Sequence, residues 1–225
     1  MTALVLAALF LPLTHFGISS SRLRDALVRR LGEQPYRGLY SLITLGALVW
    51  LVRSYRAAPT ELLWVAPAAV RGVAVAMVFV AFLLMVLGAT TPNPTTIGAE
   101  RLLERPDVVR GILRVTRNPF LWGVGLWALA HVAVVGDLAG VVLFASIGAL
   151  GLIGAPLVDA KKAERHGERW RAFAAATSSV PFLAVAQGRQ RLALSEIGWW
   201  RVVLAVALFV ATLLVHRWAF GVSPL

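Results

Sequence analysis

The sequence predicts an all-α fold: a polytopic membrane protein built as a bundle of about six transmembrane helices with a cytoplasmic interfacial helix. Of its 225 residues, 59% are hydrophobic and only 15% are charged, whereas a soluble domain carries about a quarter charged residues. The mean hydropathy is +0.76. No Gly/Ser-rich or low-complexity segment divides the chain, so we expect a single transmembrane domain over residues 1–225.

Six apolar segments are the expected spans, because about 20 apolar residues are needed to cross a bilayer core. The first segment has no basic leader and no small-residue cleavage site, so it is predicted to be a retained span. The fourth begins at Asn118-Pro119, a typical helix start. The six predicted ranges are 3–18, 36–52, 68–89, 119–136, 141–158 and 199–218.

Two charged segments flank these spans. Residues 19–35 are basic and expected to be partly helical, and residues 159–173, which include Trp170, are expected to form the interfacial helix. In the fifth span Gly148, Gly151 and Gly154 are three apart. Small residues at this spacing let a neighbouring backbone approach closely, although glycine is also an ordinary filler of membrane helices.

Positive charge predicts the orientation. If the N-terminus lies outside, the loops on the inner side hold 18 of the 22 lysine and arginine residues and those on the outer side hold 4. The positive-inside rule therefore places both termini in the periplasm or its equivalent. The net charge of +11 is then explained by topology and by contact with anionic lipids. Membrane lipids are the expected partners, and nucleic acid is not. The absence of cysteine excludes thiol chemistry and disulfides.

Three of the four histidines fall within the predicted spans, and two of them, His15 and His131, are candidates for a functional site. His15 is near the inner end of the first span and His131 is within the fourth. A titratable side chain in a membrane span requires a partner, so it marks a candidate functional site. Imidazole is a common ligand of metals and of haem iron, and a structural hydrogen bond between helices explains the pattern equally well. His166 fits a solvated position and His216 an interfacial anchor.

Short motifs spread in order along nearly the whole chain resemble the NnrU family. The resemblance implies a bacterial inner-membrane protein linked to nitrite and nitric oxide metabolism during denitrification. It does not settle the biochemical activity, and catalytic residues stay unassigned. The motifs are Leu13-Thr-His15-Phe-Gly, Arg30-Leu-Gly-Glu33-Gln-Pro-Tyr36-Arg-Gly-Leu-Tyr40-Ser, Tyr55-Arg-Ala-Ala-Pro59, Asn93-Pro-Thr95, Thr116-Arg-Asn-Pro-Phe-Leu-Trp-Gly123 with Ala130-His131, Gly136-Asp137, and His216-Arg-Trp-Ala-Phe-Gly221-Val-Ser-Pro224.

A more distant resemblance links the chain to zeta-carotene isomerase of plants and cyanobacteria, a haem b enzyme. It implies haem b as the cofactor and His15 and His131 as its metal-binding axial ligands. Two positions depart from that enzyme. Asn118 stands where it has a histidine before the proline. Ala128 stands where it has the cysteine implicated in a redox-linked ligand switch, so a switch to thiolate ligation is impossible in this chain.

Helix geometry sets the demands of such a site. At 1.5 Å per residue, His15 lies ~6 Å and His131 ~18 Å from the inner ends of their spans. The resulting offset of ~12 Å is near the limit that two histidines on one iron can span. A haem in the inner half of the bundle would contact aromatic walls, and Arg114 or Arg117 would meet its propionates unless these two arginines merely reflect the positive-inside bias. The expected walls are Phe16, Phe120, Trp122 and Trp127.

Two alternatives stay open. The stretches from Thr116 and from Glu164 also resemble integral-membrane isoprenylcysteine and phospholipid methyltransferases, which implies S-adenosylmethionine as cofactor. Asn118, Trp170 and Phe173 replace the histidine and tyrosines of that pattern, so its polar handles are depleted. The second alternative is a non-enzymatic membrane partner of denitrification enzymes. A hydrophobic small molecule or a redox partner protein would be the partner of the haem protein.

Overall fold

The computed structural model describes residues 1–19 and 22–224 and confirms the all-α class. Within this part of the chain, the β structure is limited to an isolated bridge between Leu62 and Asp137. The elements are α1 (Thr2–Ser19), α2 (Arg22–Leu31), α3 (Glu33–Arg56), α4 (Ala68–Thr90), η1 (Glu100–Glu104), η2 (Gly111–Arg114), α5 (Pro119–Val135), α6 (Leu138–Leu152), α7 (Gly154–Ala176), α8 (Leu183–Ala186), η3 (Leu194–Glu196) and α9 (Trp199–Phe220).

The long helices have the length and composition of membrane spans. Four of the described helices qualify: α3, α4, the nearly continuous unit of α6 and α7, and α9. The bent pair of α1 and α2 makes a fifth. The sixth apolar unit, α5, has 17 residues and is shorter than the four helical spans that qualify. The structure therefore agrees with the predicted polytopic bundle.

The boundary predicted near Asp159 was wrong. The apolar helix α6 ends at Leu152, and α7 starts at Gly154 and continues through the charged segment to Ala176. Alanine, lysine, glutamate and arginine are good helix formers, so the helix continues beyond the last apolar residues into the charged segment. Gly167 interrupts it with a positive φ of 51°, which a side chain rarely allows. The interfacial helix is thus the end of a longer helix with a kink.

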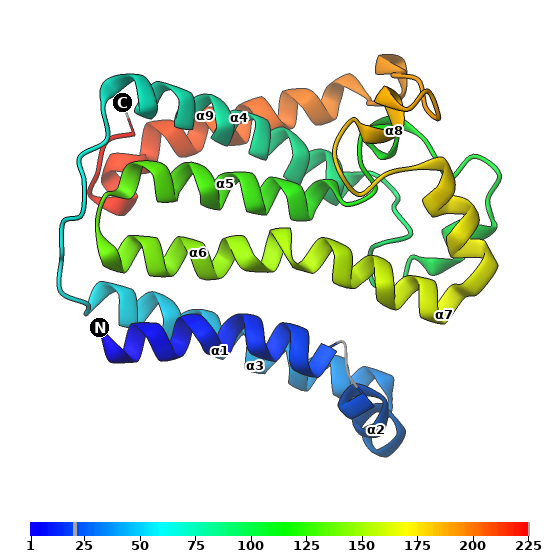
Figure 1. Cartoon of the computed structure of the whole chain (residues 1–225), viewed down its shortest axis with the longest axis horizontal. Helices are drawn as coiled ribbons and strands as arrows, with labels where there is room; N and C mark the ends of the chain where they lie inside the picture. Colours follow the sequence, from blue (N-terminus) through cyan, green and yellow to red (C-terminus); the bar gives the residue numbers. More distant parts are fainter. Residues whose placement is uncertain (20–21, 225) are drawn as a thin grey trace.

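The long helices pack side by side in a fixed order. From one side of the bundle to the other, this order is α9 and α4, then α5, then α6, and finally α1 and α3 (Figure 1). Close approach needs glycine at α5 and α6. A Cβ on Gly123 would lie 2.8 Å from the carbonyl oxygen of Ala81 on α4, and one on Gly151 would lie 2.5 Å from that of Leu121 on α5. The predicted role of the α6 glycines is confirmed at Gly151.

The α1–α3 pair joins this stack through α6. Buried side chains of the three helices form one hydrophobic cluster, which includes Leu4, Leu51 and Leu143. The hydroxyl of Ser146 on α6 donates a 2.7 Å hydrogen bond to the carbonyl of Ala8 on α1. This bond fixes how far α1 is displaced along α6, and so sets the level of His15 in the bundle.

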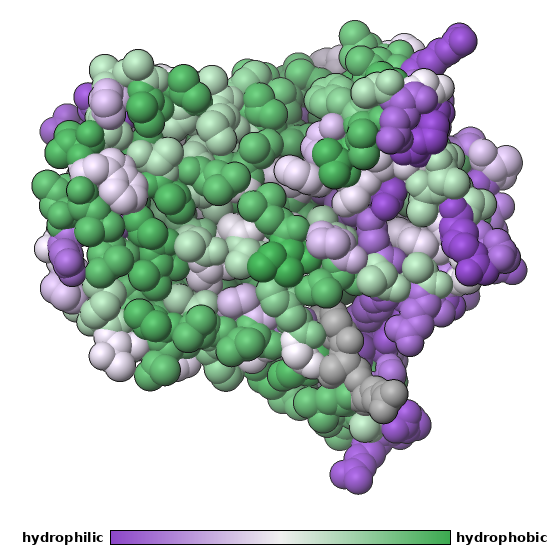
Figure 2. Space-filling model, in the orientation of Figure 1, coloured by the Kyte–Doolittle hydropathy of each residue, from purple (hydrophilic) through white to green (hydrophobic). Residues whose placement is uncertain are grey.

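Charge gathers at one end of the molecule. On the face shown in Figure 2, hydrophobic side chains cover most of the bundle and hydrophilic ones cover the end that contains α2 and α7. Both chain ends lie at the opposite, apolar end (Figure 1). The two termini therefore share one side of the bundle, as the charge distribution predicts.

Candidate functional site

His15 lies on α1 at the face packed against α3. Its Nδ1 is 3.0 Å from the carbonyl oxygen of Leu11, one helical turn earlier. Its ring meets that of Tyr40 on α3 edge-on, with 5.7 Å between the centroids. The side chain is half-buried. The imidazole is therefore oriented by its own helix and bordered by an aromatic ring of the neighbouring one.

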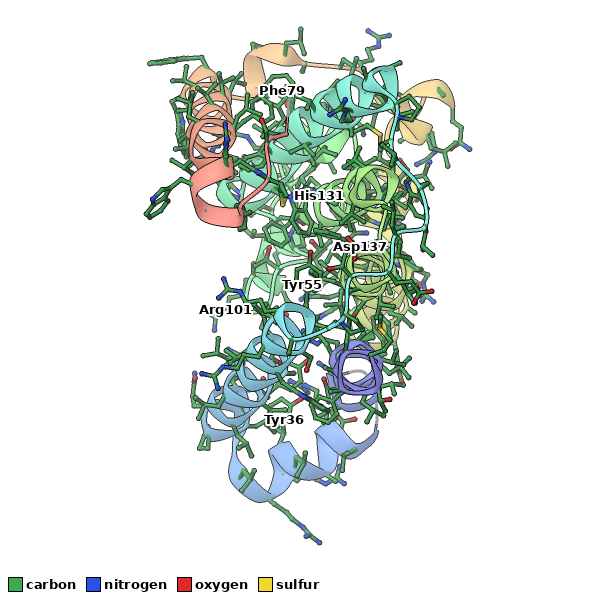
Figure 3. The ribbon with its side chains drawn as sticks, turned by 90° about the vertical axis from the view of Figure 1, so that its left-hand side faces the viewer. Tyr36, Tyr55, Phe79, Arg101, His131 and Asp137 are labelled. Carbon is green, nitrogen blue, oxygen red and sulfur yellow. The ribbon has the colours of Figure 1, made fainter. Side chains whose placement is uncertain are left out.

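His131 lies on α5 in an aromatic setting. Its Nδ1 is 2.7 Å from the carbonyl oxygen of Trp127. Its ring centroid lies 4.4 Å from that of Trp127 and 4.6 Å from that of Phe144 on α6, nearly parallel to the phenyl ring. Of the predicted wall residues, Trp127 thus contacts a predicted ligand. Figure 3 shows His131 beside α5 in the upper part of the view, well above Tyr36 of α3.

The two histidines have different neighbours and lie at different levels. Ser146 is level with Ala8, to which it is hydrogen-bonded. His15 is seven residues from Ala8 toward the charged end, and Phe144, which stacks on His131, is two residues from Ser146 toward the other end. Nine residues at 1.5 Å each give an offset of ~13 Å along the bundle, close to the ~12 Å derived from the sequence. In addition, α6 lies between α1 and α5 (Figure 1).

Arg117 is engaged inside the protein. Its Nε donates a 2.9 Å hydrogen bond to Oδ2 of Asp159 on α7, and the pair is largely buried. Asn118, which is 2% exposed, donates to the other oxygen of Asp159 and to the hydroxyl of Ser179. Its own Oδ1 has no partner in the described structure. This network ties the start of α5 to α7, so the motif around Asn118-Pro119 has a clear structural role.

Arg114 forms a second internal ion pair. Its Nε and Nη2 donate to the two carboxylate oxygens of Glu196, each at 2.8 Å, and Nη1 donates to Gln190 at 2.8 Å. These bonds raise the pKa of Arg114. The hydrogen bond from Arg114 and a second from the backbone of Gly111 lower the pKa of Glu196 to about 2. Each arginine predicted to meet propionates therefore already binds a carboxylate of the chain.

The remaining predicted walls lie apart from each other. Phe120 packs against Gly88 of α4 and is 48% exposed. Trp122 borders a second hydrophobic cluster made by α4, η2 and α7. Phe16 is half-buried on α1. The structure does not gather these aromatic rings around one space. The aromatic setting of His131 comes from Trp127, which was predicted, and from Phe144, which the sequence analysis did not single out.

Two features of the site were not predicted. A cavity of about 230 Å³ lies at the end of the bundle that holds the termini, lined by Tyr55, Asp137 and four further residues. On α3, the hydroxyls of Tyr36 near the other end of the bundle and of Thr44 near the middle of the helix are buried without a partner in the described structure. The eight-residue spacing of two hydroxyls on one helix face was the available signal for the second feature.

A site that needs three side chains on a metal is not present among residues 1–19 and 22–224. No group of three or more histidine, cysteine, aspartate or glutamate side chains comes together there. A haem site requires fewer protein ligands than such a metal site, because haem iron takes one or two side-chain ligands. The donor chemistry fits haem: each histidine has Nδ1 at a backbone carbonyl, the arrangement that orients ligating histidines. The separation of the rings and the engaged arginines do not reproduce a preformed clamp.

The structure thus defines a helical bundle of the membrane type. His15 on α1 and His131 on α5 are each oriented by a backbone carbonyl of their own helix. The chain belongs to the NnrU family, whose model, described as NnrU protein, matches residues 3–224. The family resemblance seen in the motifs is confirmed.

Curated relatives are chloroplast enzymes. The chain is 30% identical over 211 residues to the 15-cis-zeta-carotene isomerase of Arabidopsis thaliana, which covers 84% of this chain and 52% of that protein. It is 29% identical over 210 residues to the enzyme of the same name from Zea mays, with the same coverage. The chain therefore spans about half the length of these relatives. No solved structure matches.

Proposed function

We propose that the chain is a haem-dependent, isomerase-like protein of the bacterial inner membrane that binds haem b through His15 and His131 and acts in nitrite and nitric oxide metabolism. The observation that carries the proposal is the matched setting of the two histidines. Each Nδ1 lies at the carbonyl of the residue four positions earlier. A histidine held in this way presents Nε2 as the ligating atom.

His131 is the primary ligand in this proposal. Its ring is fixed by Trp127 and Phe144 as well as by its hydrogen bond, so little side-chain freedom remains to be lost on binding. His15 has one aromatic neighbour, Tyr40, and lies ~13 Å away along the bundle. The second bond to iron is therefore expected to be the weaker one.

Bound haem would supply an iron centre that changes oxidation state next to an apolar substrate. The chain's own residues limit the chemistry. The chain has no cysteine, and Ala128 is 1% exposed and packed toward Gly148 of α6. In this proposal, histidine is therefore the side chain that binds the iron in both of its oxidation states. A hydrophobic small molecule and a redox partner protein are the partners that this proposal requires.

The location follows from charge. The arginine-rich end with α2 and α7 faces the cytoplasm and both termini face the periplasm, because translocation disfavours clustered positive charge. The proposal includes membrane lipids as partners of this end and excludes nucleic acid, since the basic residues belong to a membrane-facing surface.

The absorption spectrum of the full chain, purified in mild detergent, tests the proposal. We expect a Soret band in the wild type, its loss in His131→Ala, and a shifted, weaker band in His15→Ala. His166→Ala is the control, because His166 lies on the charged part of α7 and is not one of the two proposed ligands. A colourless preparation that haemin cannot reconstitute contradicts the proposal.

The two alternatives have less support. In the methyltransferase pattern, Trp170 and Phe173 would border the methyl donor, but they are 2% and 4% exposed and belong to a hydrophobic cluster with Ile112. Binding of S-adenosylmethionine in calorimetry, weakened by Glu164→Ala, would favour that reading. Co-purification with a denitrification enzyme and no bound cofactor would favour the non-enzymatic partner.

A further inference from the structure

Three polar side chains form a stripe along one face of α3, one helical turn apart: Tyr36, Tyr40 and Thr44. The rings of Tyr36 and Tyr40 are stacked with 6.0 Å between centroids, and His15 of α1 meets Tyr40 edge-on. Figure 3 shows Tyr36 near the base of the molecule, between α3 and α1. The stripe therefore lies along the seam of the α1–α3 pair.

Two hydroxyls of this stripe are buried without hydrogen bonds in the described structure: those of Tyr36 and Thr44. Tyr36 as a whole is only 5% exposed. A buried hydroxyl without a partner destabilises a fold, and native proteins supply such groups with a protein, water or ligand partner. Two of them on one face indicate a molecule with polar atoms at this seam.

Three other threonines, within or at the end of helices, contrast with Thr44. The hydroxyls of Thr14, Thr90 and Thr177 donate to the carbonyls of Leu11, Val86 and Phe173, each within or at the end of the same helix. A threonine in an apolar helix normally satisfies itself in this way. Thr44 does not, so its hydroxyl is available to a partner from outside α3.

Positive charge is in excess at the Tyr36 end of the stripe. The guanidinium of Arg24 on α2 lies 5.4 Å from the centre of the Tyr36 ring. Three arginines here share two carboxylates: Arg24 and Arg37 bind Glu33 at 2.8 Å and 3.0 Å, and Arg165 of α7 binds Asp25 at 3.3 Å. The excess favours an acidic ligand over a neutral or cationic one.

We propose that this stripe binds the acidic head of an amphipathic molecule. A carboxylate or phosphate oxygen accepts the hydroxyl hydrogen of Tyr36 beside Arg24, and a second polar atom of the molecule pairs with Thr44, two helical turns or ~12 Å further along α3. The carboxylate source is haem, in which case the inference rests on the proposed function. The phosphate source is a membrane phospholipid, and the inference then stands without haem.

Direct binding tests the inference on the full chain after delipidation in mild detergent. Haemin is titrated and followed by the Soret band, and phosphatidylglycerol in mixed micelles is titrated separately and followed by native mass spectrometry. The variants are Tyr36→Phe and Thr44→Val. Thr90→Val is the matched control, because its hydroxyl binds only its own helix. Tyr36→Phe should weaken binding of one probe about tenfold and Thr44→Val a few-fold, while Thr90→Val leaves it unchanged.

The outcomes separate the sources. Weakened haemin binding alone supports the carboxylate, and weakened lipid binding alone supports the phosphate. Retained, hydroxyl-dependent lipid binding in a protein that takes up no haemin supports this inference and contradicts the proposed haem function. The inference is overturned if both variants bind both probes as the wild type does. A higher unfolding temperature of these variants would then show that the hydroxyls are simply unsatisfied. Thr44→Val keeps the test valid if Tyr36→Phe does not fold.

Discussion

Arg117 and Asp159, 42 residues apart in the chain, form a largely buried ion pair that joins the start of α5 to α7. Asn118 binds the second carboxylate oxygen, so the aspartate accepts from two neighbouring residues. Removal of one charge from a buried pair leaves the other without compensation and costs about 3–5 kcal/mol. The pair therefore stabilises the packing of the N-terminal end of α5 against α7.

We expect Asp159→Asn and Arg117→Ala to lower the free energy of unfolding by about 3 kcal/mol each, measured by denaturant titration in mixed micelles. The control is Arg169→Ala, which breaks an ion pair with Glu104 whose side chains are 67% and 58% exposed. Such exposed pairs contribute about 0–1 kcal/mol. Equal losses for the buried and the exposed pair would contradict the structural role of Arg117.

Close packing of α5 on α6 gives a second prediction. Gly151→Ala places a Cβ 2.5 Å from the carbonyl oxygen of Leu121 and 2.6 Å from the backbone nitrogen of Gly125, and backbone atoms move only if the helices separate. We expect a loss of about 1–3 kcal/mol of stability. Gly46→Ala, on α3 with open space around its Cβ, should be neutral or slightly stabilising. A tolerated Gly151→Ala would show that α5 and α6 are less closely packed.

Acid should weaken the contact between η2 and η3. The pKa of Glu196 is lowered to about 2 by hydrogen bonds from Arg114 and the Gly111 backbone. Because the folded-state pKa is below the unfolded one, the stabilisation is complete above about pH 4.5. It is lost as the pH falls from there toward 2. The unfolding free energy of the wild type should fall in this window, and Glu196→Gln should reduce the slope.

The matched control for this titration is Glu168→Gln. The Glu168 side chain is 85% exposed, so its removal should leave the pH dependence of stability unchanged. An identical slope in the wild type and in Glu196→Gln would show that the ion pair with Arg114 makes no net contribution.

Hydropathy predicted the spans because a helix that crosses a bilayer requires a continuous run of apolar residues, which is visible in the sequence. It did not predict the boundary between α6 and α7, since charged residues such as Lys161 and Glu164 favour a helix as much as apolar ones do. The partners of Arg114 and Arg117 lie 82 and 42 residues away. Positive charge near a membrane end follows from topology alone, so nothing local distinguishes an arginine that binds a carboxylate of the chain from one that awaits a ligand.

For the histidines too, the sequence predicted the position along the helix but not the neighbours in space. Their place in apolar helices marked His15 and His131 as candidates. The offset of ~12 Å expected from helix rise is close to the ~13 Å obtained when the same rise is counted from the Ser146–Ala8 hydrogen bond. The lateral arrangement was not accessible, because it depends on the order in which the helices pack. The insertion of α6 between α1 and α5 (Figure 1) is decided by long-range contacts such as that of Ser146 with Ala8.

The aromatic contacts of His131 yield the last prediction. Trp127 both accepts the His131 hydrogen bond through its backbone carbonyl and packs its ring against the imidazole at a tilt of 42°. Trp127→Leu keeps the backbone carbonyl and removes the ring contact, which contributes about 0.5–1.5 kcal/mol for an aromatic pair. If His131 ligates haem, haemin affinity should fall by about two- to twelve-fold, measured as the midpoint of a Soret titration. Trp218→Leu, 90% exposed on α9, should bind haemin as the wild type does. Unchanged affinity in Trp127→Leu together with lost affinity in His131→Ala would mean that the imidazole binds iron without being held in place by its neighbours.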